Sequence, residues 1–61
     1  MDRLTMDEAE RIYQDFLSGE IRDRDDIRYA CDISARRNGI DYYALLAAVD
    51  AIYYAEDQYD R

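Results

Sequence analysis

The side chains that most often carry out catalysis are scarce in this sequence. It has no histidine to shuttle protons, no glycine-rich phosphate loop, and no base recognisably paired with Cys31 or a serine. Cys31 has no second cysteine to bond with, and its position on an apolar stripe predicts a buried side chain. We therefore expect a binding protein that is not an enzyme and that uses no cofactor.

Three aspartates, at positions 23, 25 and 26, alternate like the start of an EF-hand calcium loop. Such a loop needs a glycine at its sixth position and a glutamate at its twelfth, and this chain has Arg28 and Ser34 there. The absence of histidine and of a Cys-x-x-Cys pair also argues against zinc. Helix capping explains these acids better, so no metal site is predicted.

The charge of the chain selects the kind of partner. Fifteen acidic and eight basic residues give a formal net charge of −7, which repels nucleic acid and anionic membranes and attracts basic surfaces. The basic pair Arg36 and Arg37, followed by Gly39, is reminiscent of a helix-turn-helix, but the next helix offers Ala, Leu and Tyr with carboxylates in place of base-reading side chains. We expect a protein partner with a basic surface and no direct contact with nucleic acid.

One candidate docking face combines tyrosines with carboxylates. Tyr43, Asp50, Tyr54 and Asp57 are separated by seven, four and three residues, which places them on one stripe of a helix. Tyrosine provides a large contact area with a polar tip, and carboxylates select basic partners. The alternative is that the tyrosines lie along the edge of the fold with their hydroxyls in water.

A second candidate is an array of acids without an obvious partner nearby in the sequence. Such an array could imitate the phosphates of a duplex and occupy a groove lined with arginine and lysine. The alternative is a solvated acidic surface that serves solubility. The array consists of Glu8, Glu10, Asp15, Glu20, Asp50, Glu56 and Asp57. For partner binding we select Asp15, Asp50, Glu56 and Asp57 for charge, and Tyr43 and Tyr54 as aromatic anchors.

Three helices are predicted, over about 6–18, 24–38 and 42–57. Two glycines divide the chain, and each part opens with a residue that can cap a helix. Thr5 with Glu8 forms a capping-box pattern, and Asp23 and Asp41 are the expected caps of the second and third helices. The short connections favour a compact all-α three-helix bundle with antiparallel neighbours.

Apolar residues recur at helical spacing in all three segments, with Ile21 and Ile40 expected to close the ends of the core. The predicted inward residues are Met6, Ala9, Ile12, Tyr13, Phe16 and Leu17; Ile27, Ala30, Cys31 and Ser34; and Tyr42, Leu45, Leu46, Val49, Ile52 and Tyr53. Asp50 is the only charged residue between Tyr42 and Ala55, so the third helix is apolar nearly all round. Part of it is expected to meet another molecule.

In size, charge and helical content the chain resembles the short acidic helical proteins that phages and mobile elements encode against host defence, such as anti-CRISPR and anti-restriction proteins. The resemblance implies an inhibitor that occupies a basic, nucleic-acid-handling surface, as a DNA mimic. The alternative function is a self-association or adaptor module that acts through the apolar face of the third helix, as a homodimer or in a partner's groove. The first residues lack the charged start and apolar run of a signal peptide, so a cytoplasmic location is expected.

Overall fold

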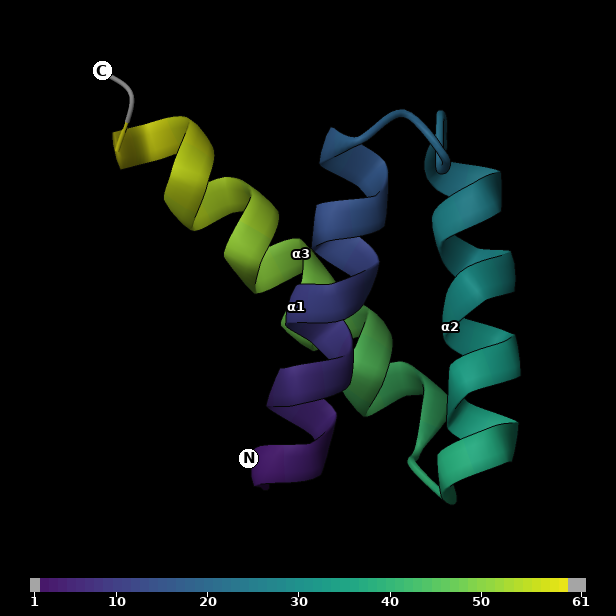
Figure 1. The fold of residues 1–61 in the computed structure, drawn as a ribbon. Coiled ribbons are helices and arrows are strands. Elements are labelled where there is room, and N and C mark those ends of the chain that lie inside the picture. The colour runs from purple at the N-terminus through teal and green to yellow at the C-terminus, as the bar shows by residue number, and fades with distance from the viewer. Residues whose placement is uncertain (1, 60–61) are drawn as a thin grey trace.

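The fold is all-α, with three helices packed compactly (Figure 1). The computed structural model describes residues 2–59 of the chain, and side chains over residues 2–55. Helix α1 spans Arg3–Leu17, α2 spans Arg24–Asn38 and α3 spans Tyr42–Tyr59. Helices α1 and α2 lie antiparallel, and α3 begins beside the end of α2, crosses behind α1 and contacts both. The predicted fold class is thus confirmed, and no strand occurs in the described residues.

Helix α1 begins one turn earlier than the sequence predicted. Asp2 is the cap, and its Oδ1 accepts a hydrogen bond from the backbone N–H of Thr5 at 2.7 Å. This bond from the Thr5 amide stabilises the carboxylate form and holds the pKa of Asp2 below its usual value. Thr5 lies inside the first turns and is buried, so the predicted capping box of Thr5 with Glu8 is wrong.

The caps predicted for the other two helices are confirmed. Asp23 Oδ1 accepts from the backbone N–H of Asp26 at 2.9 Å, and Asp41 Oδ2 accepts from that of Ala44 at 2.9 Å. Helix α2 ends at Gly39, whose φ of 67° is the left-handed conformation that glycine adopts without strain. Local sequence therefore decides where α2 and α3 begin.

Small side chains occupy much of the core. Ala9, Cys31 and Ala48 are fully buried beside the larger Leu45 and Val49. Small residues at such positions allow helices to approach closely. The remaining buried apolar residues are Ile12, Ile21 and Ala35, and Ile40 packs against them, as predicted for Ile21 and Ile40. Sequence reasoning did not place Ala35, Ala48 or Thr5 in the interior.

The C-terminal half of α3 leads away from the other two helices (Figure 1). Tyr53 and Tyr54 on this half are 40% and 51% exposed. Leu17, at the end of α1, lines an open groove with Ile52 and Ala55 and is 59% exposed, so its prediction as an inward residue is wrong. The divergence of α3 leaves Leu17 without a covering helix. None of the helices in the described part of the chain is long and apolar enough to cross a membrane.

Candidate functional site

The predicted docking face on α3 is built around an arginine from α2. Arg24 Nη2 lies 3.8 Å from Asp50 Oδ1 and donates a hydrogen bond to the Tyr54 hydroxyl at 3.2 Å. Asp50 is therefore paired with a counter-ion that is distant in the sequence, which agrees with the absence of a partner nearby in the sequence. We call Arg24, Asp50 and Tyr54 the α2–α3 cluster. Sequence reasoning missed Arg24, because its partners lie 26 and 30 residues away and no local spacing relates them.

Tyr43 lies on the same face of α3, in its first turn, and at 76% is the most exposed of the large hydrophobic side chains in residues 2–55. Its ring packs edge-on against Tyr42, with the ring centroids 5.1 Å apart. Eleven residues separate Tyr43 from Tyr54, which corresponds to about 16 Å along a helix. The two tyrosines thus share a face at its two ends, with Asp50 between them.

The other predicted charges do not join this face in the described structure. Asp15 is half-buried on α1, where it lines an open groove between α1 and α2 together with Glu20 and Asp26. The side chains of Glu56 and Asp57 lie outside the described residues, although α3 runs through both positions. The six predicted partner-binding residues therefore include two that meet in one cluster, Asp50 and Tyr54.

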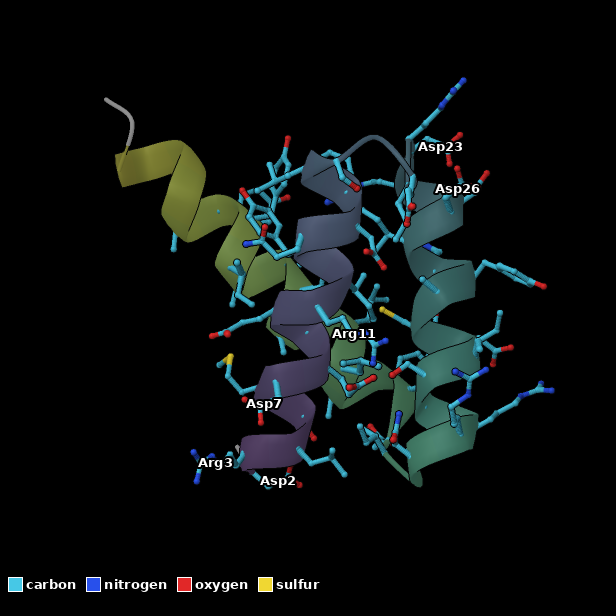
Figure 2. All side chains as sticks on the ribbon, viewed as in Figure 1. Asp2, Arg3, Asp7, Arg11, Asp23 and Asp26 are labelled. Carbon is cyan, nitrogen blue, oxygen red and sulfur yellow. The ribbon has the colours of Figure 1, made fainter. Side chains whose placement is uncertain are left out.

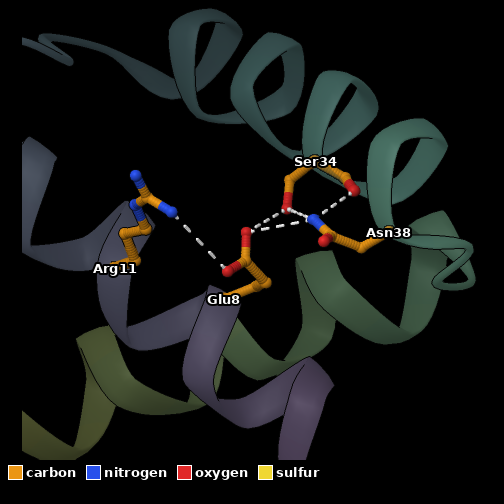
Figure 3. A network of polar contacts seen from close by, with 4 residues as sticks. All are labelled: Glu8, Arg11, Ser34 and Asn38. Carbon is orange, nitrogen blue, oxygen red and sulfur yellow. Dashed lines mark hydrogen bonds and ion pairs between the residues drawn. The ribbon is translucent and has the colours of Figure 1, made fainter.

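Glu8 is held in a network that joins α1 to α2 (Figure 3). Ser34 Oγ donates to Glu8 Oε1 at 2.7 Å, and Asn38 Nδ2 donates to the same oxygen at 3.2 Å. Arg11 Nη1 lies 4.0 Å from Glu8 Oε2. Because these contacts are partly buried, Glu8 serves the fold, and its prediction as an acid without a partner is wrong.

Two exposed ion pairs lie along α2. Arg28 pairs with Asp25 at 3.6 Å, and Arg36 pairs with Asp32 at 3.3 Å. Asp32 also lies four residues from Arg28 in the sequence, but Arg28 pairs with Asp25 instead. Exposed pairs of this kind add a few tenths of a kcal/mol, roughly, and they neutralise much of the charge on α2.

Carboxylates without a counter-ion gather on α1 and the connection that follows it. Within residues 2–55 the side chains of Asp7, Glu10, Asp15 and Glu20 make no ion pair or hydrogen bond. Figure 2 shows Asp7 on the side of α1 away from α2, whereas Arg11 points toward α2. We call these four carboxylates the α1 acidic set. Asp7 was not among the acids selected from the sequence.

Cys31 lies in the core and is fully buried, as predicted. Burial raises the pKa of its thiol to about 11, because a thiolate is poorly solvated there, and the charge of Asp50 adds to this effect. A thiol with such a pKa is a poor nucleophile at neutral pH. Cys31 is therefore a packing residue.

This state of Cys31 can be tested by alkylation. We expect iodoacetamide at pH 8 to modify native Cys31 at least a hundredfold more slowly than the chain unfolded in urea, because about one thiol in a thousand is ionised at that pH and the sulfur is covered. Intact-mass spectrometry over time measures both rates. Equal rates in the two states would show that Cys31 is accessible, in contradiction to its place in the core.

Within the described residues no three potential metal ligands come together. Comparisons with protein-family models, curated proteins and solved structures find no match. The fold and the candidate surfaces define a small all-α protein with a paired α2–α3 cluster and an acidic α1. A function for this chain has to be inferred from these residues.

Proposed function

We propose that this chain is a non-catalytic inhibitor or modulator that places its acidic surface against the basic, nucleic-acid-handling surface of a larger protein or complex. The observation that carries the proposal is the α1 acidic set, which has no counter-ion within the described residues. Carboxylates held on a helix offer a basic groove the repeated negative charge for which it is built. In this role the chain competes with nucleic acid for the partner.

The ion pairs within the protein support the assignment of partner binding to the α1 acidic set. Arg24, Arg28 and Arg36 are each held by an aspartate on α2 or α3. Helix α2 therefore adds nothing to the net charge of −7, because it carries four arginines against three aspartates, whereas α1 carries four acids against two arginines. Long-range attraction from this face steers a basic partner toward it and raises the association rate.

A pair of double variants with equal net charge tests the proposal. Asp7→Asn with Glu10→Gln removes two charges of the α1 acidic set, and Asp25→Asn with Asp32→Asn removes two that are already paired. The assay is the release of fluorescent duplex from purified nucleic-acid-binding complexes, including a CRISPR effector and a restriction endonuclease. We expect the first variant to need at least tenfold more protein for half release, and the second to resemble the wild type.

Two results of this comparison would count against the proposal. Equal effects of both variants would show that only the net charge matters. If the wild-type protein released duplex from none of the complexes, the proposal that it competes with nucleic acid would be contradicted. Circular dichroism of each variant ensures that a loss of helix is not read as a loss of binding.

The divergence of α3 favours a second candidate function, in which this helix pairs with a second copy or docks in a partner's groove. Tyr53 and Tyr54 are exposed on its C-terminal half, and Ala51 and Ala55 are exposed beside them. Small side chains next to aromatic ones suit close helix packing. Replacing Ala51 with tryptophan should abolish such pairing, as measured by light scattering after size exclusion, and should leave duplex release unchanged. A dimer that survives this substitution would reject the second candidate.

A further inference from the structure

A cavity of about 180 Å³ lies where the three helices meet. Its walls are formed by Tyr13 and Phe16 from α1, Ile27 from α2, and Val49 and Tyr53 from α3. The rings of Phe16 and Tyr53 meet edge-to-face, with centroids 5.9 Å apart. The interior is therefore mostly apolar and is framed by aromatic rings.

The volume of this cavity matches one small aromatic ring. An apolar cavity of about 150 Å³ in a protein core stays dry and binds benzene. The cavity here is slightly larger and opens to the surface, so a ring carried on a chain can enter it. Phe16 and Tyr53 offer ring edges and faces to a third ring, and such aromatic contacts add to the burial of apolar area.

The rim connects the cavity to the candidate docking face. Arg24 and Asp50 of the α2–α3 cluster both line it, together with Arg22 and Asp23. Two arginines and two aspartates have no net charge, so the rim does not draw in a cation. Arg24 also places a guanidinium beside the opening, where it can interact with the face of an aromatic ring.

We propose that this cavity is a socket for one phenylalanine ring of the protein partner. The inference rests on the proposed function, because it assumes a protein bound to the neighbouring surface. A buried aromatic anchor in a pocket supplies much of the energy of many interfaces, while surrounding charges set orientation and association rate. The acidic α1 would thus attract the partner, and the socket would slow its release.

Toluene, which reproduces the phenylalanine side chain, is the probe for the socket. We expect its titration to shift the methyl resonances of Ile27 and Val49 in a saturable manner, followed by carbon–proton correlation spectra. Ile27→Phe fills the cavity from its own wall, so toluene affinity should fall at least tenfold. Ile33→Phe makes the same change on α2 at a residue that does not line the cavity, and it should bind toluene like the wild type.

The same two variants, tested for duplex release, separate the socket from the proposed function. Ile27→Phe should weaken duplex release at least tenfold, while Ile33→Phe leaves it unchanged. Toluene shifts that are absent, or that spread over exposed residues such as Tyr43 and Leu17, would overturn the socket. Full release activity in Ile27→Phe would also overturn it and leave the proposed function standing. Toluene binding in a chain that releases no duplex would overturn the proposed function instead.

Discussion

Leu45→Ala is expected to leave a large fraction of the protein unfolded at room temperature. Leu45 is the largest of the fully buried side chains, and truncating a buried leucine costs about 2–5 kcal/mol. A single helical domain of this size has roughly 3–5 kcal/mol of stability in total. The loss is therefore comparable with the whole free energy of unfolding. Urea unfolding followed by circular dichroism measures it.

Leu17→Ala is the matched control for this substitution. Leu17 is 59% exposed at the end of α1, and most exposed substitutions change the free energy of unfolding by less than about 0.5 kcal/mol. The midpoint of its urea transition should stay close to that of the wild type. Similar midpoints for Leu45→Ala and Leu17→Ala would contradict the packing of α3 in the core.

Glu8→Ala is expected to destabilise the protein by about 2 kcal/mol, because hydrogen bonds to charged groups contribute about 1.5–3 kcal/mol each when partly buried. The substitution leaves Ser34 and Asn38 without the carboxylate that accepts from both. Differential scanning calorimetry should show a clear fall in the melting temperature. The loss of stability arises where α1 contacts α2, and it does not require a change in the packing of α3.

Glu10→Ala is the control here, since Glu10 lies on the same helix and is exposed, with no partner in the described part of the chain. Both substitutions remove one glutamate and introduce the same good helix former, so charge and helix propensity are matched. Glu8→Gln keeps an acceptor oxygen and should lose less stability than Glu8→Ala. Equal melting temperatures for Glu8→Ala and Glu10→Ala would show that the network of Figure 3 does not stabilise the fold.

Local signals in the sequence predicted the helices well, because capping depends on residues three positions apart. Asp23, Gly39 and Asp41 act where the sequence placed them. The start of α1 was mistaken because two capping patterns overlap there. Asp2 caps the helix one turn earlier, and Thr5 is then free to be buried. Helix propensity is compatible with capping by Asp2 and with capping by Thr5, so only the packing of the helices determines which residue is the cap.

The partners of charged residues could not be predicted, because the side chains that meet are far apart in the chain. Asp50 has no obvious partner nearby in the sequence, yet Arg24 reaches it from the start of α2. Two of the partners of Glu8, Ser34 and Asn38, likewise lie 26 and 30 residues away from it. The angle between helices decides such contacts, and it depends on small buried residues such as Ala48 that carry little signal in a sequence. The socket depends on the same angle.

The most direct test of the proposed function is the dissociation constant of this chain for a nucleic-acid-binding complex that carries no nucleic acid, measured at a series of salt concentrations. Binding through the α1 acidic set predicts that this constant rises steeply with ionic strength, because exposed charges are screened. The Asp7→Asn, Glu10→Gln variant should show a shallower salt dependence than the wild type. A dissociation constant that is unaffected by salt, or a salt dependence identical in the two proteins, would contradict the proposal that these carboxylates bind a basic partner.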